Sequence, residues 1–263
     1  MALYHILSVF RQMTWATLAA RSGDSIAFQA AHIQVPAASH NPRGHTLGII
    51  GLGNIGFAIA KKVRAAFDMR ILYYDVTRKN PEQEREVSAT FYESLDELLL
   101  ISNCVLIATP AGRPLLTART LALLPRGARV VNIARGNLID ENALADALES
   151  GRVSAAGLDV HMKEPFVSQR LSARRDVTLT CHTGGGSVET IKGFEKLAME
   201  NVIAVLSGQE PLTCVNKHYM RRQINGSGEY MNGHVNGHGP DGVMHQTTNV
   251  RAGVVVNNAH GSC

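Results

Sequence analysis

The stretch Leu47-Gly48-Ile49-Ile50-Gly51-Leu52-Gly53-Asn54-Ile55-Gly56 joins a short apolar run to a spaced set of glycines, and a helical pattern follows it. In such a turn Gly51 permits the tight bend, Gly53 lets the backbone approach a pyrophosphate, and Gly56 lets the new helix pack closely on its strand. Asn54 and Ile55 open that helix, whose unpaired N–H groups and positive dipole end would face the phosphates. The stretch predicts a dinucleotide-binding turn, although a tight strand-to-helix turn without a ligand would share the pattern.

A second apolar run, Ile71–Tyr74, ends in Asp75, which lies 19 residues beyond Gly56. A carboxylate at the end of the second strand hydrogen-bonds the adenosine ribose and would repel the additional phosphate of NADP. We therefore expect NAD as the cofactor. Arg78 and Lys79 follow at once and could hold a phosphate, so NADP is the less favoured alternative.

The composition is that of an ordinary globular protein. The chain has 263 residues, a net charge of +4 and 45% hydrophobic residues, and no basic run is interleaved with aromatic residues. We expect neither a nucleic-acid partner nor a transmembrane segment. The cysteines (Cys104, Cys181, Cys214 and Cys263) are scattered, which argues against a disulfide framework or a metal site and favours the cytoplasm.

Residues Met1–Arg21 contain no acidic residue and place Arg11 and Arg21 on an amphipathic pattern. A mitochondrial presequence would share these properties. An ordinary packed helix is the favoured interpretation, and a mitochondrial location is the alternative.

From Gly44 onward, apolar runs typical of strands alternate with helical patterns. The predicted strands are Leu47–Ile50, Ile71–Tyr74, Ala89–Phe91, Cys104–Ala108, Arg129–Ile133, Ala155–Val160 and Val177–Cys181. The predicted helices are Phe57–Phe67, Leu95–Ile101, Thr117–Leu124, Glu141–Ser150 and Val188–Leu206. This alternation predicts a doubly wound α/β fold, in which helices cover both faces of a parallel sheet and ligands bind at the carboxyl ends of the strands.

Polar residues follow three of these predicted strands. Arg135 comes after the Arg129–Ile133 run, Asp159 and Glu164 lie at and beyond the end of the next, and His182 directly follows Val177–Cys181. The planar guanidinium of an arginine can bind a substrate carboxylate that lies beside a carbonyl. A histidine paired with a carboxylate side chain can act as a general acid or base. Such a pair could protonate a ketone oxygen as hydride arrives at carbon. A surface salt bridge for the arginine and a structural histidine are the alternatives.

Taken in order, these motifs resemble the D-isomer-specific 2-hydroxyacid dehydrogenase family. The resemblance runs from about Gly44 to Asn216 and rests on the glycine turn and four further motifs: Asn132-Ile133-Ala134-Arg135-Gly136, Gly157-Leu158-Asp159-Val160, Glu164-Pro165 and His182-Thr183-Gly184-Gly185. It implies an NAD-dependent enzyme that reduces a 2-oxo acid to its D-2-hydroxy acid.

The resemblance also assigns roles to residues. It implies that Arg135 holds the substrate carboxylate and carbonyl, that His182 is the acid/base, and that Glu164 orients and polarises His182. It implies that Asp159 contacts the nicotinamide carboxamide. The remaining cofactor pocket would be lined by Thr109, Pro110, Ile133, Ala134, Arg135, His182, Gly184 and Gly185.

The family resembles a two-lobed clamp, and the substrate lobe that fills roughly its first hundred residues has no counterpart here. We expect residues 1–43 to form a helix and linker left from the interdomain and dimerisation region, residues 44–185 the Rossmann domain, residues 186–217 a returning helix, and residues 218–263 a disordered tail. The apolar face of Ala2–Arg21 (Leu3, Ile6, Leu7, Phe10, Trp15 and Leu18) would be exposed, which favours a homodimer. A helix packed back on its own sheet is the alternative.

The absent lobe leaves other functions open. A cofactor-sensing or corepressor-like protein with weak or no turnover is one alternative, and a truncated dehydrogenase gene product is another. The residues that would select the substrate side chain belong mostly to that lobe, so the sequence does not name the 2-oxo acid.

Overall fold

The structure of the chain is a computed structural model that describes residues 1–214. Residues Met1–Glu195 form one compact unit, and a second begins at Lys196. The predicted disordered tail, residues 218–263, lies outside the described residues.

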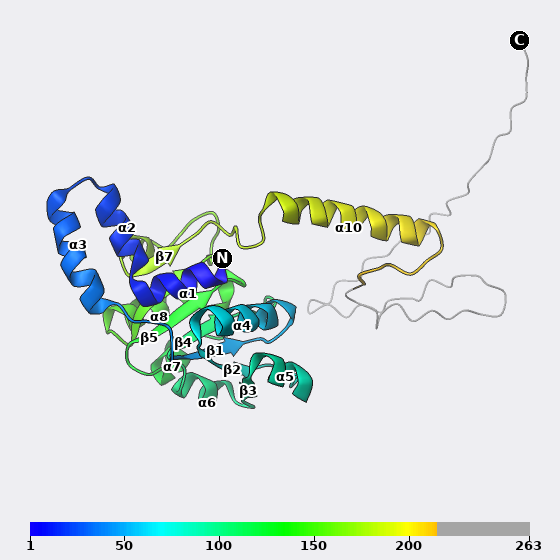
Figure 1. Cartoon of the computed structure of the whole chain (residues 1–263), viewed down its shortest axis with the longest axis horizontal. Helices are drawn as coiled ribbons and strands as arrows, with labels where there is room; N and C mark the ends of the chain where they lie inside the picture. Colours follow the sequence, from blue (N-terminus) through cyan, green and yellow to red (C-terminus); the bar gives the residue numbers. More distant parts are fainter. Residues whose placement is uncertain (215–263) are drawn as a thin grey trace, which may run out of the picture. The chain divides into compact units, whose positions relative to one another are not determined.

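The first unit is built on one parallel sheet (Figure 1). The strand order is β3-β2-β1-β4-β5-β6-β7, and every neighbouring pair is parallel. The strands are β1 (Thr46–Ile50), β2 (Arg70–Tyr74), β3 (Ala89–Phe91), β4 (Cys104–Ile107), β5 (Ala128–Asn132), β6 (Val153–Leu158) and β7 (Val177–Leu179). The chain reverses its direction of winding between β1 and β4, and this switch point is where doubly wound sheets bind ligands. The predicted fold class is confirmed.

Helices pack on both faces of the sheet. One hydrophobic cluster joins the sheet to α1 (Ala2–Arg11), α4 (Asn54–Phe67) and α5 (Pro81–Val87). The other joins it to α6 (Leu95–Leu100), α7 (Ala118–Leu123), α8 (Glu141–Glu149) and α9 (Gln169–Ser172). Because both faces are covered, the central strands β4 and β5 are buried along their whole length, as their near-continuous apolar runs predict.

The amino-terminal segment corrects one expectation. The predicted helix Ala2–Arg21 is two helices, α1 and α2 (Met13–Arg21), separated by Gln12, whose φ of 52° is left-handed. Ile6 and Phe10 are fully buried against the sheet, so the expectation that they are exposed is wrong. The physical reason is that α1 covers the part of the sheet, over β5 and β6, that α4 leaves open.

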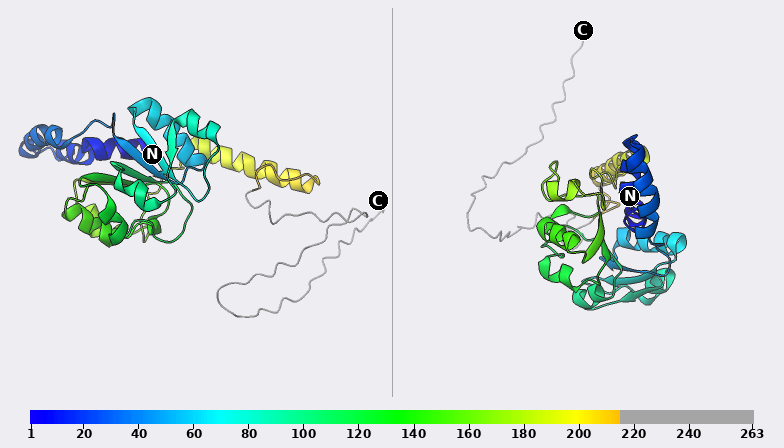
Figure 2. Two further views of the ribbon diagram at one scale, coloured as in Figure 1. Left: turned by 90° about the horizontal axis from the view of Figure 1, so that it is seen from below. Right: turned by 90° about the vertical axis from the view of Figure 1, so that its left-hand side faces the viewer.

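Beyond α1, helix α2 and helix α3 (Ser25–Ala38) form a hairpin that projects from the body of the first unit (Figure 2). The guanidinium carbon of Arg175 lies over the ring of Trp15 on α2, 3.6 Å from the ring centroid. This contact joins the hairpin to the turn before β7. We name α2 and α3 the helical arm. Helix α3, like α5 and α9, was not among the predicted helices.

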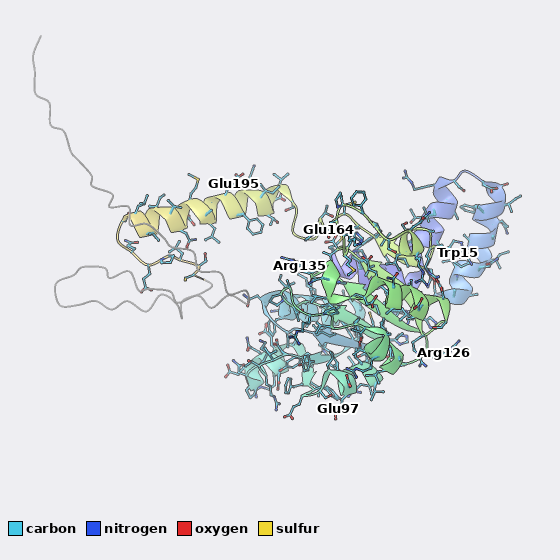
Figure 3. All side chains as sticks on the ribbon, turned by 180° about the vertical axis from the view of Figure 1, so that it is seen from behind. Trp15, Glu97, Arg126, Arg135, Glu164 and Glu195 are labelled. Atoms are coloured by element: carbon cyan, nitrogen blue, oxygen red, sulfur yellow. The ribbon has the colours of Figure 1, made fainter. Side chains whose placement is uncertain are left out.

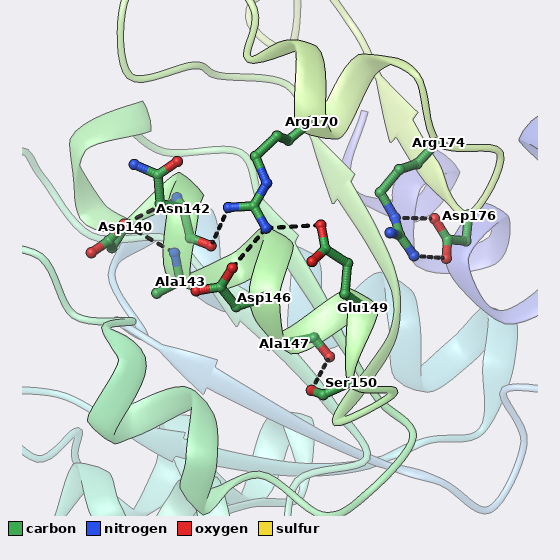
Figure 4. Close-up of polar contacts among 10 residues, drawn as sticks. All are labelled: Asp140, Asn142, Ala143, Asp146, Ala147, Glu149, Ser150, Arg170, Arg174 and Asp176. Atoms are coloured by element: carbon green, nitrogen blue, oxygen red, sulfur yellow. Dashed lines mark hydrogen bonds and ion pairs between the residues drawn. The ribbon is translucent and has the colours of Figure 1, made fainter.

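Helix α8 is fixed by polar contacts at its start and along its length (Figure 4). The Asp140 carboxylate caps it by accepting the amides of Asn142 and Ala143. Arg170 of α9 bonds Asp146 at 2.6 Å and Glu149 at 2.8 Å, and so holds α9 on α8. These contacts fix the connection between β6 and β7, whose carboxyl ends carry the candidate site.

Helix α10 (Val188–Leu206) has the predicted bounds and crosses from the first unit into the second. Its return to the sheet stays a prediction. Among the described residues, no helix combines the length and the apolar character that crossing a membrane requires.

Candidate active site

The glycine turn follows β1 with the geometry that a dinucleotide requires. Gly51 has a φ of 93°, and a Cβ there would lie 2.7 Å from the Cγ2 of Thr109. A Cβ on Gly56 would press on the carbonyl oxygen of Gly51. Gly53 differs, because no atom lies within 4 Å of the position that its Cβ would take. The turn is therefore closed toward the protein at Gly51 and Gly56 and open at Gly53, where a pyrophosphate would approach.

Asp75 lies beside this turn at the end of β2. Its carboxylate accepts the amide of Leu52 at 2.9 Å and forms an ion pair of 3.3 Å with Lys79. The guanidinium of Arg78 is engaged by Glu84 at 2.9 Å. Both cations that could have held a 2′-phosphate thus have carboxylate partners, which agrees with a preference for NAD.

Three features of this turn fit a dinucleotide. They are the open approach over Gly53, the carboxylate of Asp75 against the amide of Leu52 in the turn, and the hydroxyl of Thr109, which is buried and has no hydrogen-bond partner among the described residues. Thr109 and Pro110 follow β4, next to the switch point. A buried hydroxyl without a partner has unused hydrogen-bonding capacity that a ligand can satisfy.

The loop after β5 is pinned by Asn132. Its side-chain oxygen accepts the amide of Ala134 at 3.0 Å, and its side-chain nitrogen donates to the carbonyl of Arg135 at 2.8 Å. A Cβ on Gly136 would collide with the backbone of His161, so the loops after β5 and β6 lie in direct contact. Figure 3 shows Arg135 and Glu164, one from each loop, in this region.

His182 and Glu164 form the central pair of the site. The Nδ1 of His182 lies 2.8 Å from the Oε2 of Glu164, and the two side chains are 44% and 37% exposed, so a substrate can reach them. The other Glu164 oxygen accepts the amide of His161 at 2.9 Å. The hydrogen bond with His182, followed by that from His161, lowers the pKa of the Glu164 carboxyl below its usual value. Glu164 therefore stays ionised and can hold the imidazole in one orientation.

Asp159 organises the backbone around this pair. It is buried, and its carboxylate accepts the hydroxyl of Thr180 at 2.5 Å and the amides of Thr183 and Gly184 at 3.1 and 2.7 Å. Burial alone would raise the pKa of this carboxyl, but these three hydrogen bonds together lower it below its ordinary value. The carbonyl of Asp159 also accepts the amide of His182 at 2.7 Å.

The structure thus brings together most of the residues predicted from the sequence. Glu164 and His182 are in contact, Asp159 binds the loop that carries Gly184, and Asp75 binds the glycine turn. Arg135 is exposed, and one guanidinium nitrogen donates to the carbonyl of Ala134. Among the described residues, no hydrogen bond or ion pair joins Arg135 to His182 or Glu164.

Several residues that shape the site escaped the sequence reasoning. Asn132 lies inside a recognised motif and His161 lies between two of them, so the motifs were a signal for both. His5 and Thr180 had no such signal, because their 3.0 Å contact joins positions 175 residues apart.

Residues 3–184 match the family described as "D-isomer specific 2-hydroxyacid dehydrogenase, NAD binding domain". The glyoxylate reductase of Pyrococcus horikoshii is 43% identical over 181 residues, which are 68% of this chain and 53% of that protein. The crystal structure of the holo form of Rhodotorula graminis D-mandelate dehydrogenase superposes with a TM-score of 0.80 at 42% identity, over 82% of this chain and 64% of the other.

A glyoxylate reductase from Paecilomyes thermophila superposes with a TM-score of 0.75 at 34% identity, over 82% of this chain and 64% of that structure. The chain therefore spans only about half to two thirds of the length of these relatives. The match of the family covers most of the first compact unit. The chain belongs to the D-isomer specific 2-hydroxyacid dehydrogenase family, and residues 3–184 are its NAD-binding domain.

Proposed function

We propose that this protein is an NAD-dependent oxidoreductase that reduces a 2-oxo acid to a D-2-hydroxy acid. The observation on which the proposal depends is the exposed His182–Glu164 pair, with its 2.8 Å contact, at the carboxyl edge of a sheet that also carries a dinucleotide turn. A proton donor beside a hydride donor is the arrangement that carbonyl reduction needs.

In this mechanism the guanidinium of Arg135 binds the carboxylate of the substrate and the oxygen of its carbonyl. Its exposed side chain offers donors beyond the one bound to Ala134. NADH, when bound, supplies the hydride. The protonated imidazole of His182 gives its proton to the carbonyl oxygen, and Glu164 stabilises the positive charge and the orientation of the ring. In the reverse direction the neutral imidazole removes the hydroxyl proton.

The relatives support the substrate class. Proteins named glyoxylate reductase and D-mandelate dehydrogenase are similar to this chain at 43% and 42% identity. We therefore propose a 2-oxo acid between glyoxylate and an aromatic acid such as phenylglyoxylate in size.

The test is the oxidation of NADH by the purified chain with glyoxylate, hydroxypyruvate and phenylglyoxylate, followed by chiral analysis of the product. Replacing His182 by Ala should lower kcat by about 10²–10⁴-fold, the range of general acid–base catalysis, while the Kd for NADH changes little. The matched control is His40→Ala, since His40 is an exposed histidine before β1, at the opposite end of the strands.

Two outcomes would contradict the proposal. Turnover that survives in His182→Ala would remove the assigned acid/base. A folded chain that binds NADH but reduces none of these acids would show that this chain is not the reductase proposed.

We also propose that the protein is a homodimer in the cytoplasm. The helical arm exposes apolar side chains that its own unit leaves uncovered, with Ile26 78%, Ile33 62% and Leu18 56% exposed. Exposed apolar clusters of this kind mark interaction surfaces. The scattered spacing of the cysteines suits no disulfide framework, which supports a reducing compartment.

A further inference from the structure

A chain of side-chain contacts joins helix α1 to the candidate active site. The Nε2 of His5 lies 3.0 Å from the hydroxyl oxygen of Thr180, and that hydroxyl lies 2.5 Å from the carboxylate of Asp159. Asp159 in turn accepts the amides of Thr183 and Gly184. His182 directly precedes these two residues, and Gly185, where a Cβ would meet no atom within 4 Å, directly follows them. His5 is fully buried on α1, and this contact spans 175 residues of sequence.

The direction of each hydrogen bond in the series His5–Thr180–Asp159 is fixed. An ionised carboxylate only accepts hydrogen bonds, so the hydroxyl of Thr180 donates its one hydrogen to Asp159. The hydroxyl can then only accept from His5, which places the proton of the neutral imidazole on Nε2. The Nδ1 of His5 is consequently an acceptor, and it is buried without a partner among the described residues.

Packing does not explain an imidazole at this position. A buried acceptor without a partner lowers stability, and a leucine of similar volume would fill the same space without that cost. The Thr180 backbone is held independently, because the Nε2 of His161 bonds its carbonyl at 2.8 Å and its own amide donates to Leu158. The contact that is specific to His5 is the one that orients the Thr180 hydroxyl.

We infer that His5 is a positioning residue, which acts through the Thr180 hydroxyl to hold the Asp159 carboxylate where it receives the nicotinamide carboxamide of the cofactor. This inference rests on the proposed function, because it needs the cofactor to bind with its nicotinamide at Asp159. It extends the cofactor site to a residue of α1 that does not touch the cofactor itself.

The test compares two ligands by titration calorimetry: NADH, and ADP-ribose, which lacks the nicotinamide. His5→Leu should weaken NADH binding by about 3- to 10-fold, the contribution of one neutral hydrogen bond, and Thr180→Val by at least as much, because its hydroxyl also donates to the ionised Asp159. Both variants should leave the Kd for ADP-ribose within about twofold. Because His5 acts through Thr180, the double variant should bind NADH no more weakly than Thr180→Val alone.

The control is Ser8→Ala. Ser8 is buried on the same helix, and its hydroxyl has no partner among the described residues. This change therefore perturbs α1 and leaves the contacts between His5, Thr180 and Asp159 in place. It should leave both affinities unchanged. Thr180→Val also keeps the test usable if His5→Leu does not fold.

The outcomes separate the two proposals. Equal weakening of NADH and ADP-ribose, or additive losses in the double variant, would overturn the role of His5 and leave the proposed function standing. Failure of the unsubstituted chain to bind NADH at all would overturn both.

Discussion

At the scale of single residues, Gly51 and Gly53 lie in one turn but meet different surroundings. Gly51 has a left-handed φ of 93° and would press a Cβ against Thr109, whereas a Cβ on Gly53 meets no atom within 4 Å. Gly51→Ala should therefore lower the free energy of unfolding by about 2 kcal/mol or more, since strained backbone and a steric clash add. Gly53→Ala should change it by less than about 1 kcal/mol, yet weaken NADH binding ~10-fold by blocking the approach to the pyrophosphate.

Urea unfolding and NADH titration of the two variants, run side by side, check this division. Gly56 is not a suitable control, because its Cβ would strike the carbonyl of Gly51. If Gly53→Ala binds NADH as tightly as the unsubstituted protein, the phosphates do not lie over this turn.

The same scale shows where prediction from sequence reached its limit. Asp75, Glu164 and His182 could be predicted because each follows a strand, and the carboxyl ends of parallel strands meet at one edge. His5 could not, since its partner Thr180 directly follows the last strand of the sheet and its own helix carries only an apolar pattern. Arg135 was predicted as a ligand for the substrate, and its role stays a prediction.

At the scale of elements, strand positions followed from apolar runs, and Ala89–Phe91 has the predicted bounds. The predicted strand Val177–Cys181 ends earlier, at Leu179, because the chain turns into His182, whose φ is 55°. Helices α3 and α5 were missed for a different reason. Each buries only one residue, Ala31 or Val87, so neither has the apolar stripe by which a helix is recognised.

Helix α1 leads to a prediction about pH. Burial lowers the pKa of His5 from 6.5 to about 4, although the charge of Asp159 opposes this shift and that of His161 adds to it. Between these values the folded protein binds fewer protons than the unfolded chain, so stability falls as pH drops from 6.5 toward 4. The loss for this one buried group is at most roughly 3 kcal/mol.

His5→Leu should remove that part of the pH dependence. Its free energy of unfolding, measured by urea titration at several pH values, should fall less between pH 6.5 and 4 than that of the unsubstituted protein. Carboxylates such as Glu164 titrate in both proteins, so the difference between the two curves isolates His5. Parallel curves would mean that His5 is protonated, or exposed, in the folded state.

At the scale of the whole molecule, the sequence predicted an exposed apolar face on residues Ala2–Arg21, and this is right for Leu7 and Leu18 but wrong for Ile6 and Phe10. Ile6 and Phe10 belong to the core, because α1 covers the sheet. The most exposed apolar side chains of the amino-terminal region, Ile26 and Ile33, lie farther along, on the helical arm. Sequence alone could not separate the two, since an amphipathic helix shows which side is apolar and not what covers it.

The oligomeric state tests whether a second copy covers that arm. In the hollow between α2 and α3 lie small side chains, Ala16, Ala20 and Ala31, with Phe28 beside them, and Ile26 and Ile33 are largely exposed on α3. Ile26→Glu combined with Ile33→Glu should convert the proposed dimer to a monomer in sedimentation velocity, because burying unpaired carboxylates costs several kcal/mol. Leu100→Glu is the matched control, since Leu100 is 54% exposed on α6, away from the arm. It should leave the dimer intact. An unsubstituted protein that sediments as a monomer, or a dimer that survives both glutamates, would show that no second copy covers the apolar surface of the arm.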